Sequence, residues 1–419
     1  ALYEGFNEPC RDALWGHVYL TPELDAITKT PQFSRLHRIA QLGPAGLVYP
    51  GATHTRAAHS IGVYHIARRL ITELCERGAG SFVTARGIRS FLCAALLHDI
   101  GHFPYAHSLK DLFLTEHEQL GAQLIEADPV AGLVTQAGAD PAVTAAILDT
   151  GRATGDEEVL FYRKLLSGCL DPDKLDYLNR DARFAGVTYG TQDADFILSR
   201  LHPNRERGVD IDSRLISSVE SVLFSKYLMY RSVYWHKAVR AATAVMKKTL
   251  HSALQDAVLS PEELYGLDDS GLFAILRGRE PAFQGDNRSL FDAAMGLRDG
   301  KLWSCVLELP YDEVRHRHWE DMRCRAEAEA ELAGRYGVPV IIDVPEAVGF
   351  ETGLYVLDED CPFERSSTVF KAETVASFIK TLRAVRFFVD KDRENLLYSR
   401  GFPKMRDGKA SEAFAKLRF

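Results

Sequence analysis

The sequence predicts a mainly α-helical fold with a small α+β lobe at its C-terminal end. Apolar residues recur at helical spacing in long segments, most clearly in RAAHSIGVYHIARRLITEL (56–74). Segments typical of β-strands are concentrated late in the chain, at VPVIIDV (338–344) and AVRFFVD (384–390). With 419 residues, of which 46% are hydrophobic, the chain can bury a large core around its helices.

The N-terminal part should be helical after one entry strand. We expect a strand within 12–20, helices over 22–30 and 31–42 that each begin at a Thr-Pro pair, and the helix 56–74 after a stretch rich in Gly and Pro. The next helix, 88–97, is apolar almost all round, so it should lie inside the protein. Gly101 and Pro104 then end regular structure.

The rest of the chain predicts further helices and then the α+β lobe. The expected elements are helices at 116–127, within 128–160, within 165–187, at 228–239, 268–278, 287–303 and 311–336, a strand at 338–344, a hairpin at 351–360, a helix at 372–382 and a strand at 384–390. We divide the chain into a catalytic core (1–250), a helical extension (251–336) and the small α+β lobe (337–419).

Composition narrows the class of protein. No run approaches the ~20 apolar residues of a membrane span, and the N-terminus has neither a basic start nor an apolar signal core. The seven cysteines include no Cys-x-x-Cys pair. These features predict a cytoplasmic protein without a membrane anchor. A net charge of -8 argues against broad attraction to nucleic acid, although a local basic pocket could still hold a small anion.

A cluster of histidines follows the apolar helix at 88–97. His98 and Asp99 are adjacent, and His102 and His107 come shortly after them. An ionisable pair at the end of a buried helix must be paired, coordinated or neutralised. A bound cation would meet that demand. For a lone His-Asp pair, the alternative is an aspartate that caps the helix beside a core histidine.

Other candidate residues support a metal site only in combination. His59 alone is typical of a packed core histidine, and the pair His117-Glu118 alone is typical of a solvated helix start. On a helix within 165–187, four residues share one side by spacings of three and four: Asp173, Lys174, Tyr177 and Asp181. Alone, this side would be a solvated charged face. Beside two histidines and Asp99, it favours a fourth metal ligand.

The motifs resemble those of a known family. The segments TPQFSRLHRIAQLGPAGLVYPGATHTRAAHSIGV, LLHDIGHFPYAHS, HEQLGAQLI and DPDKLDYLNRDARFAGV resemble the HD-domain deoxynucleoside triphosphate triphosphohydrolases, in the family's order and near its spacing. The likeness is strongest to the branch whose catalytic core adjoins a sterile alpha motif in animals, a motif not visible here. It covers residues 10–250 well and the C-terminal part more loosely. It implies a helical HD-domain core.

The resemblance also implies a metal centre. His59, His98, Asp99 and Asp173 match the four ligands of one divalent ion. Two imidazoles and two carboxylates suit manganese, iron, zinc or hydrated magnesium, and they leave open positions for water and phosphate. A second magnesium ion could accompany the nucleotide phosphates.

By the same resemblance, the remaining site residues divide into a catalytic set and a substrate set. The catalytic set is His102, His107, His117 and Glu118, with His107 in a general-acid or nucleophile-related role. The substrate set is Gln41, Leu42, Tyr177 and Asp181 around the sugar 3'-hydroxyl, Arg56, Lys174 and Lys226 near the phosphates, Tyr234 under the deoxyribose, and Tyr230 and Trp235 toward the base. Tyr230 and Trp235 replace a histidine and a glutamine of the family, so the base preference stays open. For Tyr234, core packing is the alternative.

The implied partners are a deoxynucleoside triphosphate substrate and further copies of the chain, as a dimer or tetramer. Two other functions stay open. One is an HD-domain phosphatase or phosphodiesterase acting on another nucleotide, including a nucleoside monophosphate, because the same ligand set serves both. The other is a non-catalytic nucleotide-binding regulatory protein, which the intact ligand positions disfavour.

Overall fold

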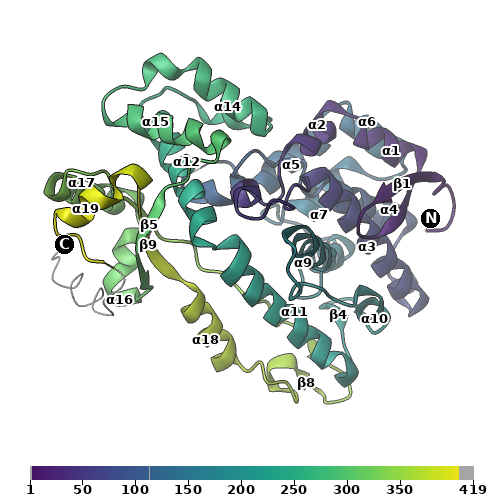
Figure 1. Ribbon diagram of the computed structural model, residues 1–419. Helices are drawn as coiled ribbons and strands as arrows, with labels where there is room; N and C mark the ends of the chain where they lie inside the picture. Colours follow the sequence, from purple (N-terminus) through teal and green to yellow (C-terminus); the bar gives the residue numbers. More distant parts are fainter. Residues whose placement is uncertain (1, 113, 405–419) are drawn as a thin grey trace.

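A computed structural model describes residues 2–112 and 114–404 and confirms the mainly α-helical fold (Figure 1). The helices of residues 56–185, called the HD region below, lie at one end of the molecule, near the N-terminus. A small sheet with its helices lies at the other end, near the last described residues. The long helices α11 and α12 run between the two ends, and α18 lies beside α11.

The N-terminal residues form a hairpin and short helices. Strands β1 (Glu8–Asp12) and β2 (Gly16–Leu20) pair antiparallel, and α1 (Pro22–Thr28) follows. The predicted helix over 31–42 is wrong beyond its first turns, because α2 (Pro31–Ser34) continues only as a 3-10 turn to Arg38. Ile39 is extended, and its carbonyl accepts from Arg56 N–H. The segment after Arg38 therefore bridges to the start of α3 instead of remaining helical.

Three helices that were expected from the sequence lie at the centre of residues 56–185. They are α3 (Arg56–Glu76), α4 (Ala85–Leu97) and α9 (Pro172–Ala185), which begin at the capping side chains of Thr55, Thr84 and Asp171. Gly62 lets α3 and α9 come close, since a Cβ there would lie 1.9 Å from Asp176 Oδ1. All three helices end or begin at the same place in the core.

Four shorter helices cover this core: α5 (His117–Ile125), α6 (Val130–Gln136), α7 (Pro141–Leu148) and α8 (Glu157–Leu166). A short helix α10 (Ala194–Leu198) and a hairpin of β3 (His202–Asn204) and β4 (Gly208–Asp210) lead to α11 (Ile216–Met229). The hairpin was not predicted.

The predicted single helix at 228–239 is wrong, because the helical path is interrupted there. A π-helical turn (Tyr230–Tyr234) separates α11 from α12 (Lys237–Gln255). Trp235 N–H donates to Tyr230 O at 2.9 Å, and the His236 side chain caps the new helix at Ala238 N–H. Tyr230, Tyr234 and Trp235 all line one cavity, although Trp235 would point away from Tyr230 on a straight α-helix.

The C-terminal part combines helices with a three-stranded antiparallel sheet of order β5-β9-β6. Its strands are β5 (Ser304–Pro310), β6 (Ile341–Asp343) and β9 (Ala384–Val389). The helices are α13 (Pro261–Leu264), α14 (Asp269–Gly278), α15 (Asp286–Gly296), α16 (Glu313–His316), α17 (Met322–Tyr336), α18 (Ala372–Leu382) and α19 (Glu394–Ser399).

Two expectations for this part need correction. The charged helix predicted at 311–336 is divided into α16 and α17, because Asp312 and Asp321 each cap a new helix start. Strand β5 was not predicted. The predicted hairpin at 351–360 lies slightly later, as β7 (Tyr355–Val356) and β8 (Cys361–Pro362).

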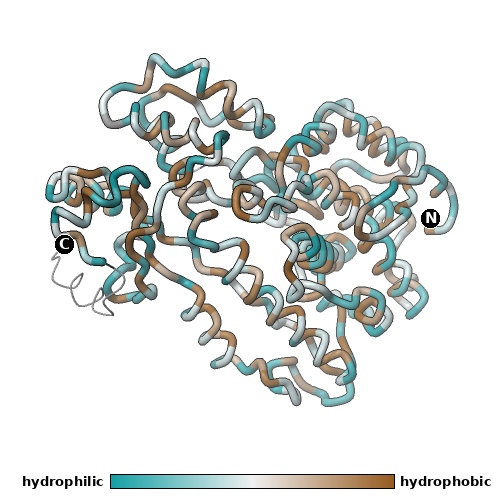
Figure 2. The backbone as a smooth tube through the Cα atoms, in the orientation of Figure 1, coloured by the Kyte–Doolittle hydropathy of each residue, from teal (hydrophilic) through white to brown (hydrophobic). Residues whose placement is uncertain are grey.

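The chain between β6 and β9 packs against the HD helices. Phe350, Leu354, Val356, Phe363 and Phe370 belong to the same buried cluster as the residues of α3, α4 and α9. Figure 2 shows hydrophobic and hydrophilic residues alternating along the long helices, as expected where one face of a helix is buried. The proposed domain boundaries at 250 and 336 stay a prediction.

Within residues 2–112 and 114–404, no helix is at once long enough and apolar enough to span a bilayer.

The close contact between the turn after α4 and the start of α5 leads to a prediction for Gly101. A Cβ at Gly101 would lie 2.0 Å from His117 O and 2.4 Å from Gly121 N, both backbone atoms. We expect Gly101→Ala to lower the free energy of unfolding by about 1–3 kcal/mol or more, because the backbone must move apart. The melting temperature measures this loss.

Gly155→Ala is the matched control, since no atom lies within 4 Å of a Cβ at that position. It should change stability by no more than about 0.5 kcal/mol. Equal melting temperatures for the two variants would contradict the close approach at Gly101.

Candidate metal and nucleotide site

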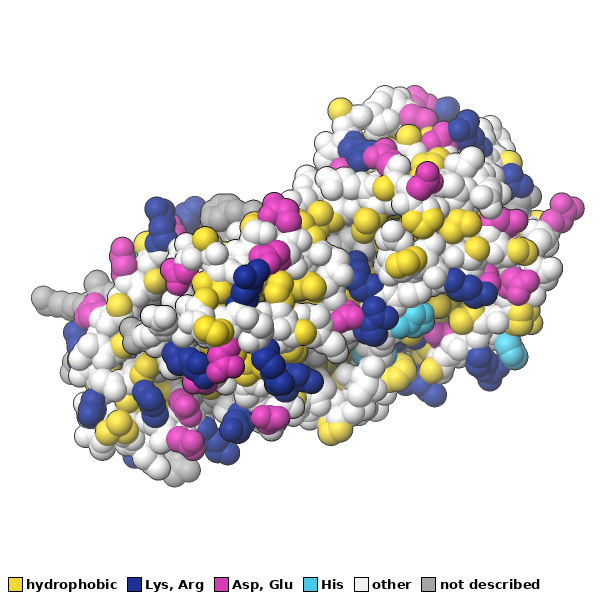
Figure 3. Space-filling model, turned by 90° about the horizontal axis from the view of Figure 1, so that it is seen from above, with side chains coloured by type: hydrophobic (Ala, Val, Ile, Leu, Met, Phe, Trp, Pro, Cys, Tyr) yellow, Lys and Arg dark blue, Asp and Glu magenta, His cyan; other side chains and the backbone are white. Residues whose placement is uncertain are grey.

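A cavity of about 760 Å³ opens where α3, α4 and α9 meet, and it extends along α12. All of the predicted site residues except His102 line it. Viewed from above, the surface shows histidine side chains beside a group of Lys and Arg side chains at a hollow (Figure 3). The fold thus brings residues from distant parts of the sequence to one place.

Four predicted metal ligands converge at the inner end of this cavity. His59 Nε2 lies 2.9 Å from Asp173 Oδ1 and 3.2 Å from His98 Nε2. His98 Nε2 lies 3.4 Å from Asp99 Oδ1 and 3.9 Å from Asp173 Oδ1. His59 comes from the first turns of α3, His98 and Asp99 from the end of α4, and Asp173 from the first turn of α9.

The outer nitrogens of the two histidines determine what the inner nitrogens can do. His98 Nδ1 lies 2.9 Å from the carbonyl oxygen of Ala95, which can only accept, so Nδ1 carries the proton. His59 Nδ1 lies 2.8 Å from Asp176 Oδ2, which favours a proton there too. In their neutral forms both histidines then direct bare Nε2 atoms at each other and at two carboxylates. Four acceptors facing one another require a cation.

The pKa of His59 also indicates that this point favours a positive charge. Burial opposes its protonation, yet the hydrogen bonds to Asp173 and Asp176 raise the pKa of His59 to about 10. The surroundings of His59 therefore favour a positive charge at this point. The donor set therefore fits a divalent cation, with two nitrogen and two oxygen ligands.

Asp99 is held from two further sides. Its Oδ2 accepts from Arg56 Nη1 at 2.8 Å, and its Oδ1 lies 3.1 Å from His102 Nδ1. Burial alone would raise the pKa of Asp99, but His102, Arg56 and His98 hold it well below its usual range. Arg56, predicted to contact phosphate, lines the cavity while it donates to this carboxylate.

A buried charge network supports His59 from behind and was missed in the sequence. Asp176 accepts from Arg180 Nε at 2.7 Å and Nη2 at 2.9 Å, and also from Trp15 Nε1. Arg180 Nη1 donates to Asp12 Oδ2 at 2.9 Å. The spacing of three between Asp173 and Asp176 on α9 was the available signal. One carboxylate faces the cavity, and the other orients a ligand.

The predicted catalytic histidines form a second cluster. His102 Nε2 lies 2.9 Å from His107 Nε2, and the His102 and His117 rings lie 3.7 Å apart between centroids. His117 Nδ1 is 3.1 Å from Glu118 Oε2. Burial and then the Arg56 charge lower the pKa of His102 to about 4, and burial also lowers the pKa of His117. Both rings are therefore neutral near pH 7.

The backbone of this histidine turn is clamped by a buried arginine that was also missed. Arg35 Nη2 donates to Ile100 O at 2.7 Å, and Arg35 Nη1 donates to His102 O and, at 2.9 Å, to Leu267 O. Burial lowers the pKa of Arg35 to about 10. The clamp fixes the carbonyls on either side of Gly101 and hence the direction of His102.

The predicted sugar-binding residues surround Asp181. Its Oδ1 lies 2.8 Å from His54 Nε2, and its Oδ2 accepts from the Tyr234 hydroxyl at 2.6 Å. Tyr234 faces Tyr177 at 6.5 Å and Tyr230 at 5.0 Å between ring centroids. Gln41, Leu42 and Trp235 line the same part of the cavity. We call this part, with its Tyr177, Tyr230 and Tyr234 rings, the aromatic wall. His54 was missed, although it lies two residues before Arg56.

The two predicted phosphate lysines are ion-paired. Lys174 Nζ donates to Asp171 Oδ2 at 2.8 Å, and Lys226 Nζ donates to Gly349 O at 2.7 Å. Glu351, which the sequence did not single out, lies near both, at 3.7 Å from Lys174 Nζ and 3.0 Å from Lys226 Nζ. Nearby acidic groups raise the pKa of Lys174, although its burial opposes this.

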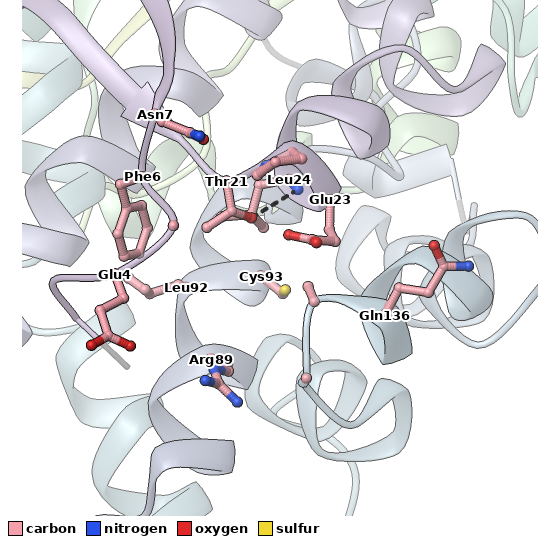
Figure 4. Close-up of a pocket in the computed structure, with 14 residues that line it drawn as sticks. Glu4, Phe6, Asn7, Thr21, Glu23, Leu24, Arg89, Leu92, Cys93 and Gln136 are labelled. Carbon is pink, nitrogen blue, oxygen red and sulfur yellow. Dashed lines mark hydrogen bonds between the residues drawn. The ribbon is translucent and has the colours of Figure 1, made fainter.

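A second cavity of about 410 Å³ lies away from this site, between the N-terminal segment, the middle of α4 and the end of α6 (Figure 4). Its lining includes Phe6, Thr21, Arg89, Cys93 and Gln136. None of the predicted site residues lies there, and its side chains form no cluster of metal ligands among the described residues.

Comparison with known families agrees with this geometry. An HD domain matches residues 56–147, the stretch from Arg56 through α7, which includes His59, His98 and Asp99. An HD associated region matches residues 193–387, which include Lys226, Tyr234 and Glu351.

The chain is also similar to individual proteins. The uncharacterized protein YwfO of Bacillus subtilis is 36% identical over 226 residues, which are 54% of this chain and 51% of that protein. The deoxynucleoside triphosphate triphosphohydrolase SAMHD1 of Danio rerio is 32% identical over 215 residues, 49% of this chain and 31% of that protein. The chain thus matches about half or less of the length of these relatives.

A solved structure extends the likeness to the whole fold. A hypothetical protein from Aquifex aeolicus superposes with a TM-score of 0.70 at 25% identity, covering 94% of this chain and 99% of that one. The HD-domain match, the paired His98 and Asp99 at the end of a buried helix, and the SAMHD1 similarity agree. The chain therefore contains an HD domain followed by an HD associated region, and about half of it is similar to a deoxynucleoside triphosphate triphosphohydrolase.

Proposed function

We propose that the protein is a metal-dependent phosphohydrolase that cleaves deoxynucleoside triphosphates at the α-phosphorus, giving a deoxynucleoside and inorganic triphosphate. The observation that carries the proposal is the cation-requiring cluster of His59, His98, Asp99 and Asp173, which shares one cavity with basic side chains and an aromatic wall. A metal ion, a phosphate chain and a sugar need these three kinds of partner. The similarity to a triphosphohydrolase supports the same substrate class.

His59, His98, Asp99 and Asp173 would hold the metal ion. Manganese, iron, zinc and magnesium all fit this donor set, and a second magnesium ion would accompany the phosphates. When bound, the ion supplies Lewis-acid chemistry at a phosphoryl oxygen and lowers the pKa of coordinated water. Asp176 and the Ala95 carbonyl keep both imidazoles oriented for this role.

The histidine cluster would supply the proton that the leaving group needs. Hydrolysis at the α-phosphorus breaks its bond to O5', and the departing oxygen must gain a proton. His107 is exposed at the cavity, and its Nε2 is within hydrogen-bond distance of His102 Nε2. His102 in turn contacts Asp99. This chain of contacts orients His107 for a general-acid or nucleophile-related role, while His117 and Glu118 pack and pair beside it.

The aromatic end of the cavity would bind the sugar. Asp181 is buried and held by His54 and Tyr234, so its remaining lone pairs have fixed directions toward a hydroxyl group. The Tyr234 ring would lie under the deoxyribose, with Gln41, Leu42 and Tyr177 around the 3'-hydroxyl. Tyr230 and Trp235 would face the base.

Product analysis tests the proposal. Purified protein is incubated with each dNTP, NTP and nucleoside monophosphate and with cyclic nucleotides, in turn with manganese, iron, zinc and magnesium. Deoxynucleoside and intact triphosphate in equal amounts support the proposal. Orthophosphate released stepwise, or an opened cyclic nucleotide, would assign the site to a phosphatase or phosphodiesterase. Tight binding without turnover would indicate a regulatory protein. Light scattering of the same samples tests the proposed dimer or tetramer.

The first prediction from this proposal concerns Asp173. Asp173→Ala should abolish metal retention and turnover but leave the melting temperature nearly unchanged, because this side chain is 39% exposed and fills no part of the apolar core. Metal content by mass spectrometry and a melting curve measure the two effects. Full activity and metal content in this variant would remove Asp173 from the ligand set.

Asp176→Asn provides the contrast, since Asp176 is buried and pairs with Arg180. We expect this variant to weaken metal binding by about 10- to 100-fold, because His59 loses its oriented partner. It should also lower the free energy of unfolding by about 3–5 kcal/mol, because Arg180 keeps only part of its charge compensation. A variant as stable as the wild type would show that the network does not support the fold.

The second prediction concerns the sugar. The wild type should prefer deoxynucleotides, and Tyr234→Ala should admit ribonucleotides by making room for the 2'-hydroxyl. Tyr234→Phe is the matched control, because it keeps the ring and removes only the hydroxyl that donates to Asp181. The ratio of kcat/KM for dATP and ATP should fall about tenfold or more in the alanine variant only. Equal turnover of ATP and dATP by the wild type would refute the sugar selectivity.

A further inference from the structure

A segment of the HD associated region enters the phosphate end of the cavity. Residues 344–350 have no regular secondary structure and run from β6 toward the lysines. Phe350 is buried in the main core and anchors the segment, with its ring 5.4 Å from Lys226 Nζ. Lys226 Nζ donates to Gly349 O at 2.7 Å and to Glu351 Oε2 at 3.0 Å. The segment therefore places one carboxylate at a fixed position in the cavity.

The Glu351 carboxylate lies near two ammonium groups, one of which also pairs with Asp171. Lys174 Nζ lies 3.7 Å from Glu351 Oε2 and 2.8 Å from Asp171 Oδ2. Lys226 is only 6% exposed, so its charge requires a partner when no ligand is bound. The charges of the two lysines are thus matched by the two carboxylates.

The two carboxylates differ in how firmly they are held. Asp171 is 2% exposed and caps α9, accepting from Lys174 N–H at 2.7 Å. The Glu351 side chain is 46% exposed, and its carboxylate contacts the two lysines. Ion pairs of such half-exposed groups contribute little to stability. Glu351 is therefore the acid that an incoming anion can replace.

We propose that Glu351 occupies the place of a substrate phosphate at Lys174 and Lys226, and that it determines the affinity of the site by competing with the phosphate chain. This inference rests on the proposed function, because that proposal places the phosphates at these lysines. Carboxylate and phosphate oxygens accept the same ammonium hydrogen bonds. A bound phosphate would release the Glu351 side chain to solvent and take over both cations, while Phe350 and the Gly349 carbonyl keep the segment in place.

Glu351→Gln tests the competition, because glutamine keeps the shape and removes the charge. The probe is inorganic triphosphate, titrated into the wild type and the variant by calorimetry. We expect the variant to bind it about fivefold more tightly at low salt. The gain should shrink as ionic strength rises. KM for dNTPs should fall by the same factor, with kcat within about twofold of the wild type.

Glu373→Gln is the matched control. Glu373 is exposed in the first turn of α18, so this substitution removes the same charge away from the cavity. It should leave triphosphate affinity unchanged. In the double variant Lys226→Gln and Glu351→Gln, the gain should be lost, because the released ammonium is absent. Melting curves establish that each variant is folded.

The outcomes separate this inference from the proposed function. Equal or weaker triphosphate binding by Glu351→Gln, or no binding by either protein, would overturn the competition, and dNTP turnover could still support the proposed function. Tighter binding by Glu351→Gln alone would support the competition even if no dNTP were hydrolysed, a result that would reject the proposed substrate. An equal gain in Glu373→Gln would overturn the inference, because net charge alone would then explain the effect.

Discussion

The site depends on four hydrogen-bond acceptors that meet at one point. His98 Nδ1 is committed to the Ala95 carbonyl and His59 Nδ1 to Asp176, so both inner nitrogens point at each other and at Asp99 and Asp173. Such an arrangement is stable only with a positive charge at its centre. The carboxylates of Asp173 and Asp176 raise the pKa of His59, which agrees with a point that favours positive charge. The surrounding fold keeps these acceptors together despite their mutual repulsion.

Helix α9 shows how one element serves several requirements at once. Asp173 faces the ligand cluster, and Asp176, one turn later, lies behind His59 in a network closed by Arg180 and Asp12. Asp181, two turns after Asp173, faces the aromatic wall. Charges are tolerated on the buried side because each carboxylate there meets a cation or several donors. The dense charge of this segment, which is unusual between apolar residues, thus has a specific cause.

The sequence was most informative where local signals and tertiary packing agree. Helices α3, α4 and α9 begin at capping side chains and were predicted well, whereas the set of site residues was expected from the family resemblance and not from local signals. The helix predicted through Ile39 and the one predicted through Trp235 both failed, because hydrogen bonds made by distant or rearranged backbone replace helical ones there. Arg35, His54 and Glu351 were missed since their partners lie far away in the chain, and no local pattern marks such contacts.

The position of Glu351 shows that the HD associated region, residues 193–387, contributes to the cavity. Lys226 and Tyr234 come from the helices around the π-helical turn, and Glu351 comes from the segment after β6, so one cavity combines the HD domain with its associated region. The two ends of the segment 344–350 belong to different buried clusters. Val344 packs in the cluster of the sheet, and Phe350 packs in the main core. Glu351 directly follows Phe350, so it is held on the same core as Lys226. The packing of Phe350 in the main core thus determines where the Glu351 carboxylate meets Lys226 and Lys174 in the cavity.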